Sequence, residues 1–256
     1  MMYFENIVFG PIKSRRLGVS LGINLLPLHG KLCNFDCIYC ECGWNKDGQD
    51  DKLLPTREAV KINLEVRLKQ MAAAGELPDA ITFSGNGEPT IHPQFSGIVS
   101  DVIALRNLYA PNTKVCVLSN ATNIDKQDVF QALQQIDQAI LKLDSGFTDT
   151  AKLINCPQSD YSVENIIAAL QQFKGKFILQ TMFLRGEHKG VKIDNTTPEE
   201  IAKWLDIVAQ LRPKEVMIYT FDRATPAEFL EKVSIAELET IAHKVRAMGI
   251  AVRVSG

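Results

Sequence analysis

The segment CNFDCIYC, residues 33–40, follows an apolar run at residues 19–25 that is typical of a buried β-strand. Its cysteines, Cys33, Cys37 and Cys40, have the spacing Cys-x3-Cys-x2-Cys. Three thiolates this close together are good metal ligands, and a [4Fe-4S] cluster usually takes four cysteines. Three cysteines on one loop would leave one iron free for an outside ligand. The segment therefore predicts a catalytic metal site at the end of a strand.

Outward from this segment, strand-like and helix-like patterns alternate along the chain, which implies parallel βαβ units with right-handed crossovers. Six units are visible, too few for a closed eight-unit barrel. We predict an α/β fold, a partial, open (β/α)6 barrel with one side open. The predicted strands are 19–25, 79–84, 114–119, 138–143, 177–184, 215–220 and 250–254, and the predicted helices are 57–74, 94–109, 125–135, 161–173, 198–210 and 234–247. The expected N-caps are Thr56, Asp125, Ser162, Thr197 and Ser234 with Glu237.

The composition is that of an ordinary globular protein, with 256 residues, 46% of them hydrophobic, and a formal charge of -2. Nothing resembles a linker, so we expect one domain, residues 1–256, with a lead-in and first strand at 1–32 and a cluster loop at 33–48. Neither a membrane span nor a secretory signal is expected, which predicts a cytoplasmic protein. In that reducing compartment, clustered cysteines suit a metal better than disulfides.

A second motif, ITFSGNGEPT at residues 81–90, lies at the end of the second predicted strand. Gly85 and Gly87 permit a close approach of the backbone to a ligand, and Glu88 offers an acceptor for a cation. Because barrel enzymes keep their sites at the C-terminal ends of the strands, this turn is expected beside the cysteine loop. A plain turn after a strand is the alternative explanation.

Polar residues also end the next two predicted strands. Asn120 suits a ribose contact or a turn. Lys142 and Asp144 share one face of their strand because side chains alternate with period two. Burying both in an apolar barrel is costly unless they pair with each other or serve the site.

Candidate substrate contacts come from both ends of the chain. Gln180 and Arg223 belong to the fifth and sixth predicted strand ends. Arg15 and Arg16 lie with Lys13 in a loop framed by glycines, and such a cluster suits a phosphate or a carboxylate. A solvated basic face is the alternative.

The cysteine segment, with Tyr39 before the last cysteine, resembles the cluster loop of the radical S-adenosylmethionine (SAM) superfamily. The resemblance implies that Cys33, Cys37 and Cys40 bind a [4Fe-4S] cluster whose open iron binds SAM. Reductive cleavage of SAM then gives methionine and a 5'-deoxyadenosyl radical that abstracts hydrogen from a substrate. The glycine turn resembles the glycine-glycine-glutamate motif that holds the methionine ammonium. The SAM contacts implied here are Tyr39, Gly85, Gly87, Glu88, Asn120, Lys142 and Asp144.

Residues 10–24, GPIKSRRLGVSLGIN, look like the radical SAM group related to enzymes of wybutosine (tricyclic guanine) synthesis in tRNA. This resemblance implies an RNA base or a nucleotide-like substrate, with a protein or peptide as the alternative. A flavodoxin or ferredoxin is the expected electron donor. The chain departs from those enzymes because it has no cysteine before Cys33, where they bind a second cluster, so tricyclic base synthesis is not carried over.

Two other interpretations of the cysteines stay open. With Cys42 as fourth ligand the cluster would be closed, and the protein would be an electron carrier or sensor instead of an enzyme. A four-cysteine zinc site would also use Cys42, but Cys40 and Cys42 are closer in sequence than zinc ligands usually are. Because metal ligands contribute little packing of their own, residues 33–48 are expected to depend on the metal for order.

Overall fold

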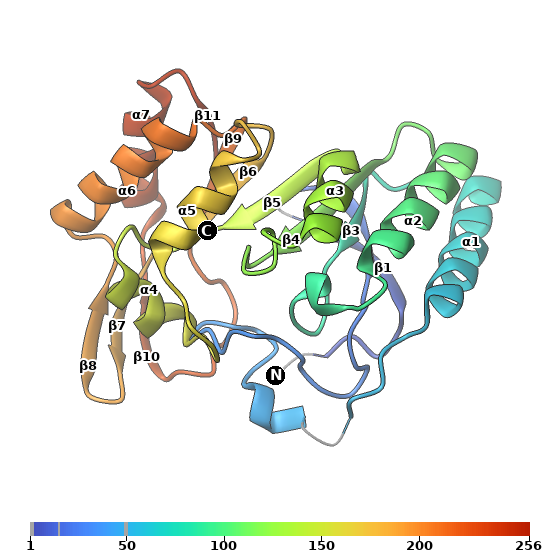
Figure 1. Ribbon diagram of the computed structural model, residues 1–256, viewed down its shortest axis with the longest axis horizontal. Helices are drawn as coiled ribbons and strands as arrows, with labels where there is room; N and C mark the ends of the chain where they lie inside the picture. Colours follow the sequence, from blue (N-terminus) through green and yellow to red (C-terminus); the bar gives the residue numbers. More distant parts are fainter. Residues whose placement is uncertain (1–2, 15, 49–50) are drawn as a thin grey trace.

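The computed structural model describes residues 3–14, 16–48 and 51–256 (Figure 1). In this part of the chain one eight-stranded sheet has the order β1-β2-β3-β4-β5-β6-β9-β11, and a three-stranded sheet has the order β10-β7-β8. Neighbours from β2 to β11 are parallel, and β1 pairs with β2 in antiparallel fashion. The large sheet consists of β1 (Val8–Ser14), β2 (Gly18–Ile23), β3 (Ala80–Phe83), β4 (Lys114–Ser119), β5 (Gln138–Lys142), β6 (Ile178–Met182), β9 (Glu215–Tyr219) and β11 (Ala251–Ser255).

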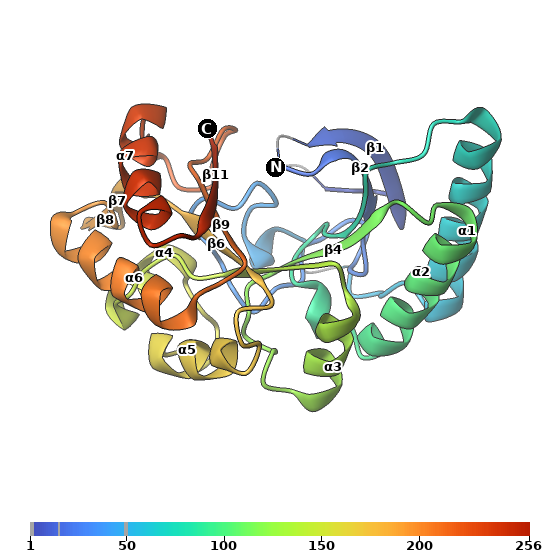
Figure 2. The ribbon, with the colours of Figure 1, turned by 90° about the horizontal axis from the view of Figure 1, so that it is seen from above.

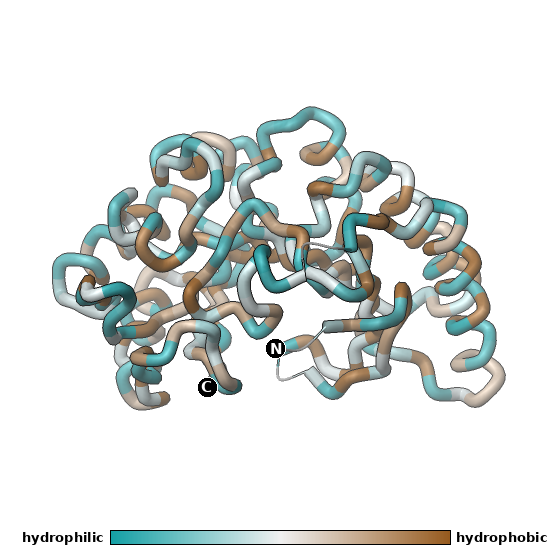
Figure 3. Tube along the Cα trace, turned by 90° about the horizontal axis from the view of Figure 1, so that it is seen from below, coloured by the Kyte–Doolittle hydropathy of each residue, from teal (hydrophilic) through white to brown (hydrophobic). Residues whose placement is uncertain are grey.

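The large sheet is curled, with helices along its convex side (Figure 2). The segment after β2 lies across the C-terminal ends of the strands, where Leu32 pairs with Gly87 after the end of β3 (Figure 1). Helices connect successive parallel strands from β2 to β11, which confirms the predicted partial (β/α)6 barrel. The outer helices alternate between hydrophobic and hydrophilic residues along their length, as expected for helices with one buried face (Figure 3). They are α1 (Arg57–Ala74), α2 (Phe95–Tyr109), α3 (Gln127–Gln135), α4 (Thr148–Asn155), α5 (Val163–Gln171), α6 (Pro198–Leu211) and α7 (Ile235–Arg246).

Side-chain caps fix most helix starts at the predicted positions. Thr56, Ser162, Thr197 and Ser234 each accept a hydrogen bond from the backbone N–H three residues further on. The predicted cap at Asp125 is wrong. Helix α3 begins after Lys126 without a side-chain cap, because the chain first makes a turn in which the Lys126 N–H bonds to the Asn123 carbonyl.

Three features of the fold are absent from the sequence prediction. Strand β1 precedes the first predicted strand, and α4 is an additional helix before α5. The strand predicted at 177–184 is divided at Phe183, beyond which the chain leaves the large sheet. It enters the small sheet, which consists of β7 (Leu184–His188), β8 (Val191–Asp194) and β10 (Phe229–Lys232).

The concave face of the sheet has an apolar layer below a polar one. Ile140, Ile178 and Met217 form a buried cluster against Leu17 and Leu118. Side chains two residues apart on a strand share a face. Two residues further along the same four strands lies a set that we call the polar layer: Asn120, Lys142, Gln180 and Tyr219.

Among the described residues, no helix has the length and apolar character that crossing a lipid bilayer requires.

Candidate active site

A cavity of about 200 Å³, here called the central cavity, collects side chains from the cysteine segment and from several strand ends. The polar layer forms one wall, and the turn after β3 forms another. Most residues predicted for the site meet here. The lining includes Arg16, Lys31, Cys33, Cys37, Cys40, Cys42, Gly85, Gly87, Glu88, Asn120, Lys142, Gln180 and Tyr219.

The cysteine segment is anchored to the rest of the protein by its own packing. Phe35 and Ile38 are 1% and 0% exposed and belong to the main core. The Ile38 N–H donates to the Ile154 carbonyl at 3.0 Å, and the Leu32 N–H donates to the Asn86 carbonyl at 2.9 Å. Packing in this segment therefore comes from the hydrophobic residues between the cysteines, and the dependence of residues 33–48 on metal for their order stays a prediction.

The thiols lie beside a buried cation. Lys31 is 4% exposed, and its Nζ donates to the Gly43 carbonyl at 2.8 Å and to Asp36 at 3.2 Å. Burial alone would lower the pKa of Lys31, but attraction to Cys40 and Cys33 outweighs burial and raises it. The ammonium group therefore stays charged and stabilises thiolates nearby.

The thiols differ in their tendency to ionise. Burial raises the pKa of Cys33 to about 12 and also raises that of Cys37. The pKa of Cys40 falls to about 5, because a hydrogen bond with Cys42 stabilises its thiolate. Of these cysteines, Cys40 is therefore the one whose surroundings most favour the thiolate, which is the form that binds a metal.

The described residues hold no group of three or more His, Cys, Asp or Glu side chains arranged to bind a metal ion. In a four-iron cluster each cysteine binds a different iron, so the ligands need to face one cavity instead of one point. Cys33, Cys37 and Cys40 meet that weaker requirement.

The glycine turn is fitted tightly against the cysteine segment. Gly85 and Gly87 have φ values of +134° and +139°, which side chains rarely allow. A β-carbon at Gly85 would lie 2.5 Å from Asn24 Oδ1, and one at Gly87 would overlap the Leu32 carbonyl. The glycines therefore bring two strand ends together as well as lining the central cavity.

Glu88 is 2% exposed and receives hydrogen bonds on both carboxylate oxygens. Oε1 accepts from the Thr90 hydroxyl at 2.5 Å and from the Ser119 hydroxyl at 2.9 Å, and Oε2 accepts from the Asn120 N–H at 2.7 Å. Burial raises the pKa of Glu88 although these donors oppose the rise. A carboxylate oxygen has two lone pairs, so Oε2 retains capacity for a cationic donor in the cavity.

Tyr39, Lys142 and Asp144 form one buried network. The Tyr39 hydroxyl donates to Asp144 and accepts from Lys142. Lys142 Nζ lies 3.8 Å from Asp144 Oδ2, and Asp144 Oδ1 accepts from the Met182 N–H at 2.9 Å. Lys142 lines the central cavity, whereas Asp144 is 1% exposed and lies behind it. The predicted same-face pair exists, and Tyr39 bridges it.

The remaining predicted residues divide into two groups. Asn120 lines the cavity, and its Nδ2 donates to Asn34 at 2.6 Å. Gln180 and Arg16 also line the cavity. Arg223 pairs with Glu41 at 2.6 Å and does not line it. Arg15 lies outside the described residues.

Two residues of the site were missed by sequence reasoning. Lys31 precedes the cysteines, but no local pattern marks a lysine there as buried. Tyr219 is the last residue of β9, and its ring lies 4.7 Å from the Arg16 guanidinium. Side chains alternate along a strand, so Tyr219 shares the concave face with Met217. The prediction for this strand rested only on the polar residues that follow it.

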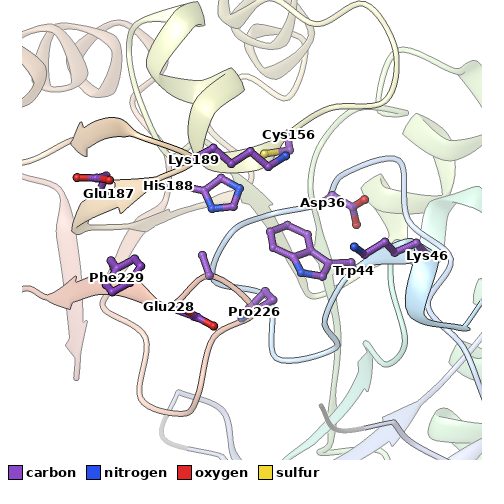
Figure 4. A pocket seen from close by; sticks show the side chains of 11 residues that line it. Asp36, Trp44, Lys46, Cys156, Glu187, His188, Lys189, Pro226, Glu228 and Phe229 are labelled. Atoms are coloured by element: carbon purple, nitrogen blue, oxygen red, sulfur yellow. The ribbon is translucent and has the colours of Figure 1, made fainter.

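A larger cavity of about 500 Å³ lies between the cysteine segment and the small sheet (Figure 4). The rings of Trp44 and His188 are stacked there with centroids 5.6 Å apart. None of the residues predicted for the site lines this cavity. The larger cavity is therefore distinct from the one that most of the predicted site residues line.

Comparison with known sequences identifies relatives over nearly the whole chain. Residues 28–190 match the family model of the Radical SAM superfamily. The chain is 30% identical to UPF0026 protein MJ1312 of Methanocaldococcus jannaschii over 92% of this chain and 70% of that protein. It is also 30% identical to a protein named GTPase Obg from Brachyspira hyodysenteriae, over 91% of this chain. The chain spans 32% of the length of that protein.

Solved structures share the fold at low sequence identity. A radical SAM methyltransferase from Sphaerobacter thermophilus has a TM-score of 0.67 at 16% identity, covering 92% of this chain and 65% of that one. A structure of TYW1 with a lysine-pyruvate adduct has a TM-score of 0.61 at 16% identity, covering 89% of this chain and 73% of that one. These likenesses establish the partial barrel, and they do not identify a substrate.

Proposed function

Because this chain belongs to the radical SAM superfamily and to the UPF0026 proteins, we propose that its central cavity binds a [4Fe-4S] cluster and SAM. Cys33, Cys37 and Cys40 would hold the cluster. The observation that carries this proposal is that these three thiols share one cavity with the glycine turn and the polar layer. The protein is an enzyme of this superfamily, and its cofactors would supply radical cleavage of SAM and hydrogen abstraction from a substrate.

The chemistry of the lining suits these two cofactors. A cluster bound by thiolates is anionic, and Lys31 places a buried positive charge beside the thiols. Glu88 Oε2 offers acceptor capacity for the SAM ammonium, and Asn120 offers an amide for the nucleoside. Lys142 offers a cation for the SAM carboxylate, and Tyr39 and Asp144 hold it in place.

The substrate we propose is an RNA base or a nucleotide-like molecule. This proposal, like the relation to wybutosine-synthesis enzymes, rests on the segment at residues 10–24. A protein or peptide substrate is the alternative. We further propose that residues 1–256 act as one domain in the cytoplasm, reduced by a flavodoxin or ferredoxin. Support for that compartment comes from the clustering of four cysteines within residues 33–42, which suits a metal site in a reducing compartment.

Anaerobic reconstitution with iron and sulfide, followed by SAM and a strong reductant, tests the cofactor assignment. Wild-type protein should form 5'-deoxyadenosine and show an electron paramagnetic resonance spectrum that shifts on adding SAM. Cys37→Ala should form no 5'-deoxyadenosine. Cys116→Ala is the matched control, because Cys116 is buried in β4 away from the central cavity, and it should keep the activity.

The same experiment tests the electron-carrier interpretation. Cys42 lines the central cavity, and its thiol donates to the Gly85 carbonyl at 3.5 Å, so a fourth cysteine is present beside the three. A cluster whose spectrum ignores SAM, and which loses stability in Cys42→Ser, would refute our proposal and favour a closed four-cysteine cluster. Cleavage of SAM by Cys42→Ser would exclude Cys42 as a necessary ligand.

A further inference from the structure

Two buried donors at the central cavity lack an acceptor among the described residues: Arg16 Nη1 and Gln180 Nε2. Gln180 is 5% exposed, so water has little access to its amide. Buried polar groups are nearly always hydrogen-bonded in folded proteins. A bound molecule is therefore expected to supply the missing acceptors.

The two donors flank one aromatic ring. The Arg16 guanidinium lies over Tyr219 at 4.7 Å from the ring centroid, and the Arg16 carbonyl accepts a hydrogen bond from Arg253. On β6 and β9, Gln180 is paired with Met217 and Met182 is paired with Tyr219, so Gln180 and Tyr219 are diagonal neighbours on the same face. Arg16 and Gln180 therefore place two hydrogen-bond donors beside the ring of Tyr219.

Arg16 also marks the boundary of a second cavity. This outer cavity, of about 210 Å³, shares Arg16, Cys40 and Tyr219 with the central cavity. Its other lining includes Phe221 and Met182, which suit an apolar or aromatic body. The acidic residues in this lining are already paired: Glu41 with Arg223 at 2.6 Å and Asp222 with Lys232 at 3.6 Å.

We propose that the substrate occupies the outer cavity and extends an oxyanion, a phosphate or a carboxylate, past Arg16 into the central cavity, where Arg16 and Gln180 bind it. The proposal deepens the function proposed above and rests on it for the identity of the neighbouring cofactors. A guanidinium binds two oxygens of either anion with parallel hydrogen bonds. The Gln180 amide adds a neutral donor to the same group. A neutral substrate could accept these hydrogen bonds, but it would leave the positive charge of Arg16 without a counter-charge.

Calorimetric titration of cluster-free and reconstituted protein tests this assignment. The probes are guanosine 5'-monophosphate, guanosine, inorganic phosphate, acetate and SAM. The variants are Arg16→Gln, Gln180→Leu and the control Arg246→Gln, whose arginine pairs with Glu239 on the surface of α7. Thermal unfolding checks that each variant is folded.

We expect wild type and Arg246→Gln to bind either the phosphate probes or the carboxylate probe, acetate. Arg16→Gln should bind that anion about tenfold more weakly or worse, as loss of a charged hydrogen bond implies. Gln180→Leu should weaken binding by a smaller factor, and SAM affinity should stay within about twofold in both variants, a margin well below one lost hydrogen bond. Preference for the monophosphate over guanosine and acetate would identify a phosphate, and preference for acetate a carboxylate.

Three results would overturn the inference. The first is that wild-type protein binds neither phosphate nor acetate. The second is that Arg16→Gln binds both anions as tightly as wild type does. The third is that Arg16→Gln binds SAM more weakly while its affinity for the anions is unchanged. The last result would assign these donors to the carboxylate of SAM. Failure of the proposed function is a separate result, because wild-type protein that cleaves no SAM can still be titrated with anions.

Discussion

Gly87 joins the two sequence motifs at the level of single atoms. Its neighbours on both sides bond to Leu32: the Leu32 N–H donates to the Asn86 carbonyl at 2.9 Å, and the Glu88 N–H donates to the Leu32 carbonyl at 3.1 Å. There is no room for a side chain between these bonds. The position of Glu88 in the central cavity therefore depends on a glycine one residue earlier.

Gly87→Ala should lower the free energy of unfolding by about 2 kcal/mol or more, because a β-carbon would overlap the Leu32 carbonyl and φ is +139°. Urea denaturation followed by circular dichroism measures the change. The control is Gly190→Ala in the β7–β8 turn, where φ is +77° but no described atom lies within 4 Å of the added carbon. The control should cost about 1 kcal/mol. Equal costs at the two glycines would contradict the packing argument.

At the scale of elements, α7 shows how one helix start is tied to the small sheet. Ser234 and Glu237 form a reciprocal capping box, and Glu237 also pairs with Arg185 of β7 at 2.8 Å. The hydrogen bond from Ser234, followed by that from Arg185, lowers the pKa of Glu237 to about 2. The stabilisation that this carboxylate provides is present above its unfolded pKa of about 4.3 and is lost as the pH falls toward 2.

Glu237→Gln should therefore be less stable than wild type at pH 6, and this difference should narrow as the pH falls toward 2. Urea denaturation at several pH values measures the difference. Thr240→Ala, on the same helix, does not titrate, so its difference from wild type should stay constant. A Glu237→Gln difference that is the same at pH 6 and pH 2 would show that the carboxylate does not stabilise the folded state through its charge.

The success of the sequence prediction also varied by element. Parallel strands and long helices were placed closely, because buried apolar runs and cap residues mark them locally: α1 begins after Thr56 and ends before Gly75, as its pattern predicts. Strand β1 was missed because its residues are mostly exposed and lack alternation. Helix α4 was missed because its N-cap is Phe147, which makes no side-chain cap. The small sheet was missed because its strands are short and pair with residues distant in sequence, so only tertiary structure defines them.

The sequence predicted the positions of those candidate-site residues that belong to a motif. It did not predict the positions of residues that only tertiary packing brings to the site. The three cysteines, Gly85 and Glu88 follow from their spacing and from the topology of parallel strands. The burial of Lys31 could not be foreseen, since its partners Asp36 and Gly43 meet it only after the loop closes. Arg223 was predicted near the substrate because it follows β9. It pairs with Glu41, which lines the outer cavity, and its contact with a substrate stays a prediction.

At the scale of the whole molecule, the cysteine segment connects parts of the fold that are far apart in sequence. Leu32 bridges to Gly87, Phe35 bridges to Pro157, and the Ile38 carbonyl accepts from the Ala227 N–H at 3.2 Å. These contacts reach the turn after β3, the end of α4 and the segment before β10. Order in this segment therefore has sources other than bound metal.

We expect metal-free protein to keep residues 32–40 ordered. Hydrogen exchange followed by mass spectrometry should show the amides of Leu32, Asp36 and Ile38 protected before reconstitution, because each donates to a backbone carbonyl elsewhere in the fold. The exposed turn at Lys189 and Gly190 provides the fast-exchanging reference. Exchange of residues 32–40 as fast as this turn, becoming slow when the cluster is added, would mean that the metal orders the segment. Slow exchange in both states would mean that the fold presents the three cysteines in advance, so that cluster binding requires little rearrangement of the chain.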